Sequence, residues 1–174
     1  ACAGAKPVVA IYSTFLQRGY DQLVHDVALQ NLDVLFAVDR AGVVGEDGAT
    51  HTGAYDISYL ACVPNLVLMA PSSAQEAISL LQLGYEHNGP AVVRYPRGVA
   101  TEGLPVVDIN MGESHLLRKG SKVAILNFGA LLPAAAEVAA SLDATLVDMR
   151  FIKPLDSNRL EQLLDHNIWV TLED

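Results

Sequence analysis

The stretch that most strongly decides the fold is residues 34–53, which read VLFAVDRAGVVGEDGATHTG. Its first five residues are all apolar, as is typical of a strand buried on both faces of a parallel sheet. The remaining residues, 39–53, include four glycines, three acids, an arginine and a histidine. Polar loops at the carboxyl ends of buried strands are where α/β sheets usually bind their ligands. Residues 39–53 are therefore predicted to form a ligand-binding loop.

Strand and helix patterns alternate on both sides of this stretch. Strands are predicted at residues 7–12, 34–39, 66–70, 91–95, 122–127, 145–148 and 168–172. Apolar residues at helical spacing predict helices at residues 16–27, 57–62, 131–142 and 156–166, and a further helix begins at Ser73, where Ser73 and Glu76 have capping-box spacing. Strands separated by helices imply parallel pairing with right-handed crossovers, so the chain is predicted to be an α/β protein.

The alternating pattern is interrupted once, which predicts two domains. Residues 99–120 have mixed polarity and no clear period, so we expect a first domain over residues 1–103, a linker over 104–120 and a second domain over 121–174. The sequence begins without methionine and stops directly after a predicted strand. We therefore expect it to be part of a longer protein.

Composition limits the classes of function. The chain has 174 residues, of which 51% are apolar and 18% charged, and its net charge of −9 gives no electrostatic basis for binding nucleic acid or an anionic membrane surface. No apolar run is long enough to span a membrane, and the first residues do not resemble a signal peptide. Cys2 and Cys62 lack metal-ligand spacing and are interpreted as reduced thiols. These features predict a cytoplasmic globular protein without a metal site in this stretch.

The glycine-rich loop contains candidate catalytic residues. His51 with Asp47 could form an acid–base pair, because histidine titrates near neutrality. A Ser13–His51–Asp47 hydrolase triad is an alternative, although Ser13 lacks the Gly-x-Ser-x-Gly elbow of such enzymes. A tight surface turn without catalytic function would also account for the glycines.

Two further pairs of residues lie at or just after the ends of predicted strands. Tyr12 and Phe15 could stack on a flat heterocycle, or could be aromatic residues of the core. Arg40 and Arg97 could bind a phosphate or carboxylate through paired hydrogen bonds, or could form surface salt bridges. Two arginines at strand ends in a chain of net charge −9 favour a small anionic substrate.

Several longer motifs carry a family resemblance. They are IYSTFLQR at residues 11–18, DRAG at 39–42, DGATHTG at 47–53, MAPS at 69–72, RYPRG at 94–98 and VDMRFIKPLD at 147–156. Together they resemble the 1-deoxy-D-xylulose-5-phosphate synthases, a family within the transketolase-like thiamine diphosphate enzymes. The resemblance implies a parallel-sheet domain that binds the cofactor pyrimidine, followed by the start of the transketolase C-terminal α/β domain.

The same resemblance implies an activity. Enzymes of this family condense pyruvate with glyceraldehyde 3-phosphate and release carbon dioxide, and their product feeds isoprenoid, thiamine and pyridoxal synthesis. The complete protein is then expected to be a homodimer in the cytoplasm, or in a plastid if it comes from a plant. Transketolase, a dehydrogenase beta subunit and a non-catalytic subunit of the same fold remain alternative interpretations.

Site roles follow from the matched motifs. The resemblance implies that Phe15 stacks on the aminopyrimidine of thiamine diphosphate, with Tyr12 and Arg18 in the same pocket. It implies that His51 transfers protons or polarises an oxygen near the reacting carbon, and that Asp47 lines the substrate site.

The resemblance also implies that this chain contains only some of the residues of the complete site. Arg40 and Arg97 match the arginines that hold the phosphate of the aldehyde substrate. The glutamate that activates the cofactor and the Mg²⁺ ligands match no residue here and are expected in other parts of a longer chain. The isolated chain is therefore expected to be inactive.

Overall fold

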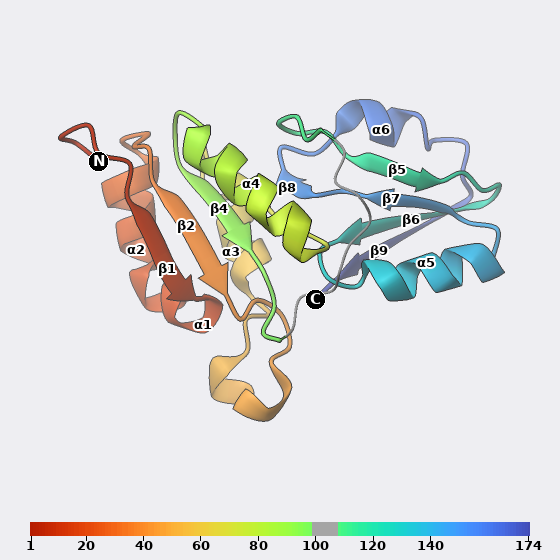
Figure 1. Ribbon diagram of the computed structural model, residues 1–174, viewed down its shortest axis with the longest axis horizontal. Coiled ribbons are helices and arrows are strands. Elements are labelled where there is room, and N and C mark those ends of the chain that lie inside the picture. The colour runs from red at the N-terminus through yellow and green to blue at the C-terminus, as the bar shows by residue number, and fades with distance from the viewer. Residues whose placement is uncertain (99–107) are drawn as a thin grey trace.

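A computed structural model describes residues 1–98 and 108–174 and shows two α/β units side by side, each built on its own sheet (Figure 1). The strands of the first sheet, in spatial order, are β1 (Val8–Tyr12), β2 (Leu35–Asp39), β4 (Ala91–Arg94), β3 (Val67–Met69) and β8 (Phe151–Lys153). The first four strands are parallel, as the sequence predicts.

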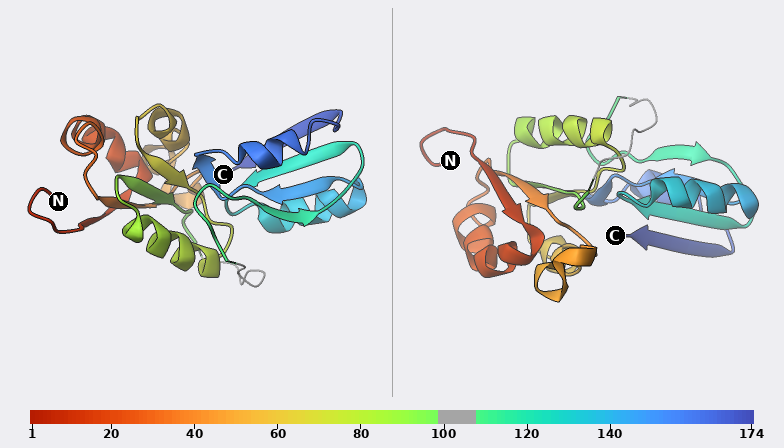
Figure 2. Two further views of the ribbon diagram at one scale, coloured as in Figure 1. Left: turned by 90° about the horizontal axis from the view of Figure 1, so that it is seen from above. Right: turned by 60° about the horizontal axis from the view of Figure 1, so that its bottom comes forward.

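Helices cover both faces of the first sheet. Figure 2 shows α4 (Ala74–Glu86) on one face, and α1 (Ser13–Leu16), α2 (Tyr20–Gln22) and α3 (Asp56–Ala61) on the other. The long helix predicted at residues 16–27 is divided by a 3₁₀ turn at residues 17–19 and ends in a π-helical segment at residues 23–28. The predicted cap of α4 is confirmed, because the Ser73 hydroxyl accepts a hydrogen bond from the backbone N–H of Glu76.

The apolar faces of these elements form the core of the first unit. Leu16, Leu23, Phe36 and Leu60 pack on one side of the sheet. The other side is filled beneath α4 by the buried residues Leu35, Val67, Met69, Leu80, Ala91, Val93 and Phe151. Both faces of β2 are therefore buried, which agrees with its continuous apolar sequence. Over the described ranges, no helix is long and apolar enough to cross a membrane.

The second sheet is smaller and mixed. Its strands, in spatial order, are β5 (His115–Arg118), β7 (Thr145–Asp148), β6 (Val123–Phe128) and β9 (Ile168–Glu173). The helices α5 (Leu132–Ser141) and α6 (Ser157–Glu161) lie on opposite faces of this sheet (Figure 2). The strands β7 and β9 both run parallel to β6, whereas β5 is antiparallel to β7.

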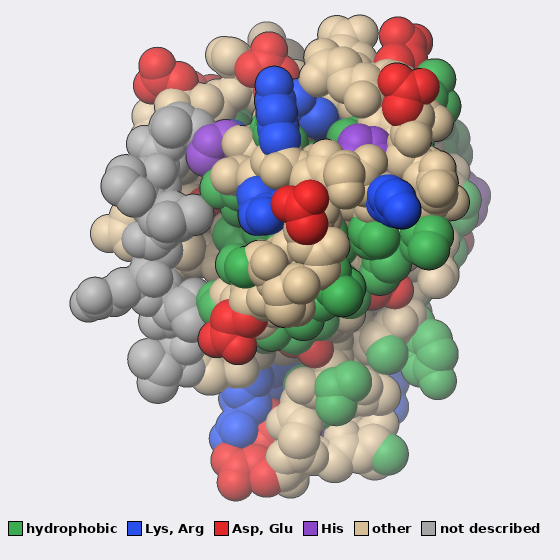
Figure 3. Space-filling view, turned by 90° about the vertical axis from the view of Figure 1, so that its right-hand side faces the viewer, with side chains coloured by type: hydrophobic (Ala, Val, Ile, Leu, Met, Phe, Trp, Pro, Cys, Tyr) green, Lys and Arg blue, Asp and Glu red, His purple; other side chains and the backbone are tan. Residues whose placement is uncertain are grey.

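One edge strand of the second sheet is β9. Figure 3 looks onto the outer side of this unit and shows hydrophobic side chains interspersed with acidic and basic ones. On β9 itself, Ile168, Trp169 and Val170 are 55%, 40% and 38% exposed. This strand is therefore an open edge that carries apolar side chains.

Two sequence expectations differ from the structure in the second unit. Residues 115–118, within the segment expected to be a linker, form β5. All four residues are half-buried and the pairing of β5 with β7 contains a register shift, so the sequence shows no clear alternation of apolar and polar residues. Residues 104–107 of that segment lie outside the described ranges. The helix expected at residues 156–166 begins after its predicted cap Asp156 but ends at Glu161, and i→i+3 turns such as Leu163 N–H to Leu160 C=O follow.

The strand β8 joins the two units, and the sequence pattern did not predict it. It pairs antiparallel with β3, placing Lys153 opposite Leu68 and Phe151 opposite Met69. The Lys153 ammonium donates hydrogen bonds to the carbonyls of Ala61 and Val63 at the end of α3. A segment of the second half of the chain thus completes the first sheet.

Candidate functional site

The site residues gather at the carboxyl edge of the first sheet. In the parallel register, Tyr12 at the end of β1 lies opposite Asp39 at the end of β2, and Val38 lies opposite Arg94 at the end of β4. The residues that follow these strands therefore emerge at one edge, where α/β sheets commonly bind ligands.

A row of aromatic rings begins at the end of β1. Tyr12 and Phe15 are stacked, with ring centroids 5.3 Å apart and planes 12° apart. Phe15 meets His51 edge-to-face at 5.6 Å, and the Arg40 guanidinium lies 3.9 Å above the Tyr12 ring. Phe15 is 44% exposed, so part of this ring remains open to a flat ligand. The structure brings together these four residues, each of which the sequence had singled out.

The loop that carries His51 is closed at its base by two glycines. Gly42 and Gly53 form an isolated antiparallel bridge, in which the Gly53 N–H donates to the Gly42 carbonyl at 2.8 Å. A Cβ at Gly53 would lie only 2.3 Å from the Arg40 carbonyl oxygen and 2.8 Å from the Ser13 hydroxyl. Gly53 is thus required by close packing of the loop against β1 and β2.

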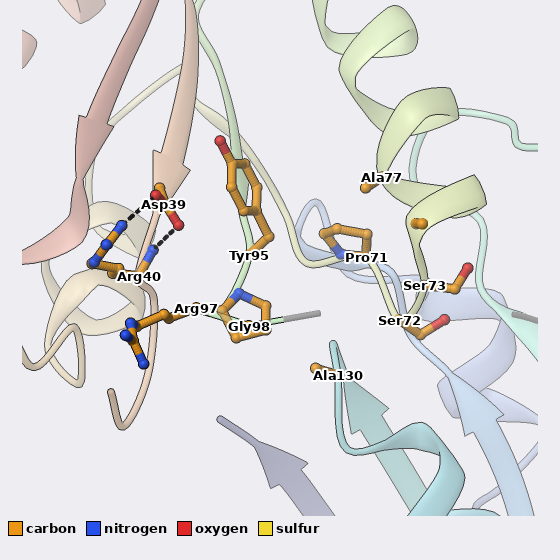
Figure 4. A pocket seen from close by; sticks show the side chains of 12 residues that line it. Asp39, Arg40, Pro71, Ser72, Ser73, Ala77, Tyr95, Arg97, Gly98 and Ala130 are labelled. Carbon is orange, nitrogen blue, oxygen red and sulfur yellow. Dashed lines mark hydrogen bonds and ion pairs between the residues drawn. The ribbon is translucent and has the colours of Figure 1, made fainter. Parts of the chain in front are cut away.

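A cavity of about 420 Å³ lies beside this loop, at the junction of the two units. Figure 4 shows Arg40 and Arg97 on one side of the cavity, and Ser72 and Ser73, which lead into α4, on the other. The remaining lining residues are Asp39, Pro71, Ala74, Ala77, Tyr95, Pro96, Gly98 and Ala130. Ala130 belongs to the second unit, so both units contribute to the wall.

The two arginines are held in place by carboxylates. Asp47 bridges them, because its Oδ2 atom lies 3.0 Å from Arg40 Nε and 3.1 Å from Arg97 Nε. Arg40 also pairs with Asp39 at 2.7 Å, and Arg97 with Glu46 at 2.6 Å. Three acids thus accompany two arginines, and an anion that enters the cavity must compete with them.

The predicted acid–base pair is not formed in this structure. His51 Nδ1 lies 3.0 Å from the Thr50 hydroxyl, while Asp47 contacts the two arginines. The alternative hydrolase triad is also not assembled, because the buried Ser13 hydroxyl donates to the Gly53 carbonyl at 3.3 Å. Asp47 pairs with the two arginines because a guanidinium binds a carboxylate more strongly than a neutral imidazole does.

The remaining sequence candidates stand apart from this group. Arg18 lies on the exposed 3₁₀ turn after α1, and within the described ranges it makes no ion pair or hydrogen bond. Cys2 and Cys62 are exposed free thiols. Arg18 is thus close to Phe15 in the sequence but is not part of the row formed by Tyr12, Phe15 and His51.

Sequence reasoning did not find the buried ion pair that supports the loop. Asp56 at the start of α3 accepts hydrogen bonds from Arg94 Nε at 3.1 and 3.0 Å, and both side chains are at most 4% exposed. Tyr59, on the same helix, packs edge-to-face on Tyr20. The arginine at the end of the otherwise apolar strand Ala91–Arg94 could have indicated a buried charge that needs a charged partner.

Comparison with known proteins identifies the family of both units. Residues 1–102 match the family model for the transketolase pyrimidine binding domain, and residues 112–174 match the model for the transketolase C-terminal domain. The chain belongs to the transketolase family. It is 57% identical over its whole length to the 1-deoxy-D-xylulose-5-phosphate synthase of Francisella tularensis subsp. novicida and 60% identical to that of Idiomarina loihiensis. It spans 29% of the length of each of these relatives.

Solved structures agree with the fold. A structure titled as a split gene transketolase, inactive beta4 tetramer, matches 99% of this chain with a TM-score of 0.88 and 25% sequence identity, and the match covers 59% of that chain. Transketolase from Campylobacter jejuni matches 97% of this chain with a TM-score of 0.75 and 18% identity, over 31% of its own length. Both units are therefore arranged as in transketolases.

Proposed function

We propose that this chain is part of a 1-deoxy-D-xylulose-5-phosphate synthase, which condenses pyruvate with glyceraldehyde 3-phosphate to 1-deoxy-D-xylulose 5-phosphate and releases carbon dioxide. Identities of 57% and 60% over the whole chain to enzymes with that name support the proposal. The observation that carries it in the structure is the convergence of Phe15, His51 and two arginines at one sheet edge. Stacking, proton transfer and phosphate binding would then be available side by side.

The aromatic row fits thiamine diphosphate. A half-exposed Phe15, stabilised by Tyr12 behind it, offers a flat apolar surface for an aminopyrimidine ring. When bound, this cofactor supplies a nucleophilic carbon and an electron sink for carbon–carbon chemistry. His51, at the edge of Phe15, would hold or transfer a proton at its free Nε2 side, because Nδ1 faces Thr50. We also propose Arg18 as a cofactor-pocket residue that needs other parts of the protein to complete its contacts.

The arginines fit an anionic substrate group. Arg40 and Arg97 both line the cavity and are linked through Asp47. A phosphate of the aldehyde substrate would bind between them by displacing carboxylate oxygens, since both ligands use the same guanidinium hydrogens. Asp47 would then line the substrate site, from which its second oxygen can accept a substrate hydroxyl.

The location of the Mg²⁺ ligands and the oligomeric state of the complete protein are also proposed. Among the described residues, no three His, Cys, Asp or Glu side chains are grouped so as to hold a metal ion. We propose that the Mg²⁺ ligands for the cofactor diphosphate lie in other parts of the complete protein, since this chain spans 29% of the length of its relatives. We also propose that the complete protein is a homodimer of the cytoplasm, with a plastid as the equivalent location in a plant.

Arg97→Ala in the complete protein tests the substrate assignment. We expect KM for glyceraldehyde 3-phosphate to rise about 10- to 100-fold, because one charged hydrogen-bonding group is worth about 1.5–3 kcal/mol, while KM for pyruvate changes little. Steady-state kinetics with each substrate varied in turn measures both. Arg118→Ala is the matched control, since Arg118 pairs with Asp143 on the second sheet away from the cavity.

Other outcomes separate the alternatives. Equal losses for both substrates would exclude a phosphate-specific role for Arg97. Turnover of ketose phosphates without pyruvate would favour a transketolase, and absence of turnover in the complete protein with either substrate set would favour a non-catalytic subunit.

The 174-residue chain alone is predicted to be inactive. A structural relative, a split gene transketolase, is titled as inactive, and this chain spans only 29% of the length of the synthases it resembles. Pyruvate decarboxylation with added thiamine diphosphate and Mg²⁺ should stay at the rate without protein. Measurable carbon dioxide release above that rate would show that the chain contains a complete site.

A further inference from the structure

A buried polar cluster joins the two units behind the cavity. Ser72 lies just before α4 and Glu76 in its first turn, and Asp148 and Arg150 come from the end of β7 and the residues after it. These four side chains are 7%, 3%, 2% and 4% exposed, in that order. The proposed chemistry uses none of the three charged groups, although burial of charges is costly.

The contacts in this cluster are short. The Ser72 hydroxyl oxygen lies 2.8 Å from Glu76 Oε2 and 2.7 Å from Asp148 Oδ2. Glu76 Oε2 also accepts the Ser72 backbone N–H at 2.7 Å, and its Oε1 accepts Arg150 Nε at 2.7 Å. One hydroxyl group therefore links a carboxyl group of the first unit to one of the second.

The number of hydrogens decides the protonation of the cluster. A serine hydroxyl has a single hydrogen to donate, and an ionised carboxylate can only accept. Two oxygen–oxygen contacts of 2.7 and 2.8 Å therefore need a second hydrogen between the three groups. That hydrogen must reside on one of the two carboxyl groups.

Asp148 is the group that keeps this hydrogen. Glu76 accepts hydrogen bonds from the Arg150 guanidinium and the Ser72 amide, whereas among the residues that the structure describes Asp148 Oδ1 has no hydrogen-bond partner. Burial, followed by repulsion from Glu76, raises the pKa of Asp148 from 3.8 to about 7, against the opposing effects of Ser72 and Arg150. The resulting chain of donors runs from Asp148 Oδ2–H to Ser72 Oγ–H to Glu76 Oε2.

The neighbouring histidine does not supply a compensating positive charge. His115 on β5 is the register partner of Asp148. Burial lowers its pKa below 6.5, and Arg150 and Arg159 add to this effect while Glu76 opposes it. The lowered pKa of His115 favours its neutral form beside Asp148.

We propose that Asp148 is a positioning residue that holds a proton and, by donating it to Ser72, fixes the cavity wall formed by residues 71–74 against the second unit. Ser72 connects the two, because it both lines the cavity and receives this hydrogen bond. Loss of the proton leaves two anions on either side of one hydroxyl group. The contact between the units then weakens.

The direction of the pH dependence follows from the raised pKa. Because the folded state binds this proton more tightly than the unfolded state, the stabilising contribution is complete below pH 3.8 and is lost as the pH rises through about 7. A single proton of this kind changes the unfolding equilibrium about tenfold per pH unit between the two pKa values.

Infrared spectroscopy of the complete protein tests the proposal directly. The carbonyl stretch of a neutral carboxylic acid should persist above the pH at which ordinary carboxyl groups ionise and should disappear with a midpoint near pH 7. Asp148→Asn, which keeps a hydrogen-bond donor toward Ser72, should lack this band. If the wild type and Asp148→Asn give the same spectra from pH 5.5 to 8.5, the proposal is wrong.

A second variant tests whether Asp148 carries this proton even if Asp148→Asn does not fold. Glu76→Gln removes the anion that opposes ionisation of Asp148, so the midpoint of the band should move to lower pH. An unchanged midpoint would assign the band to another group and overturn the proposal.

Stability measurements provide an independent readout. Two proteins are compared, the single variant His115→Asn and the double variant His115→Asn with Asp148→Asn, so that the neighbouring histidine does not titrate in either. As the pH rises from 5 to 8, the urea midpoint of the single variant, which retains Asp148, should approach or fall below that of the double variant. A constant difference between the two would show that Asp148 acts only through packing. Neither readout depends on which substrate the cavity binds.

Discussion

Replacement of His51 by asparagine in the complete protein is expected to lower kcat by about 10²- to 10⁴-fold, the usual contribution of one general acid–base group. Asparagine can still contact the Thr50 hydroxyl, which lies 3.0 Å from His51 Nδ1, but it cannot exchange a proton near neutral pH. The loss should therefore fall on kcat, with a small change in cofactor affinity. Single-turnover and steady-state kinetics with saturating substrates measure it.

The chain offers a matched histidine as the control. His25 pairs with Asp21 on the surface, and both side chains are more than 60% exposed. His25→Asn should leave kcat within about twofold of the wild type, as expected for a surface substitution. If His51→Asn has an equally small effect, the proposed proton-transfer role of His51 is excluded, while the Arg97 test still decides the substrate class.

The largest effect on stability is expected for Asp56→Ala. Removing this carboxylate leaves the Arg94 guanidinium, which is 4% exposed, without its charged partner. Breaking a buried ion pair in this way destabilises proteins by about 3–5 kcal/mol, because the remaining charge is buried and uncompensated. Urea-induced unfolding followed by far-UV circular dichroism gives the change in the free energy of unfolding.

Two further variants test the cause. Asp33→Ala removes a partly exposed pair with Lys6 at 3.6 Å and should cost less than about 1 kcal/mol. The double variant Asp56→Leu with Arg94→Met replaces both charges by apolar groups and should recover much of the lost stability. Equal losses for Asp56→Ala and Asp33→Ala would contradict a dominant role for the buried pair.

Local sequence features predicted most of the first sheet. The apolar run before Asp39 predicted a strand buried on both faces, and β2 is such a strand. The cap at Ser73 and the parallel pairing of β1, β2, β3 and β4 also followed, because capping and crossover rules act over a few residues or a single helix. Asp156 likewise caps α6 as predicted.

The pattern failed where the partner of a segment is distant in the sequence. β5 has four half-buried residues and no alternation, so only its pairing with β7 defines it. β8 has three residues, and its pairing with β3 spans more than 80 positions of the chain. Propensity and periodicity are local and carry no information on such pairings.

The sequence by itself determined which residues reach the sheet edge, because Tyr12 ends a strand with a clear apolar pattern and Arg40 and Arg97 each follow one. Only the tertiary structure decided how they are paired. Asp47 contacts Arg40 and Arg97 instead of His51, and Ser72 connects Glu76 to Asp148 across the two units. The physical reason is that charges and hydrogen-bond donors select partners by distance and burial in space, and these are fixed only when both sheets have assembled.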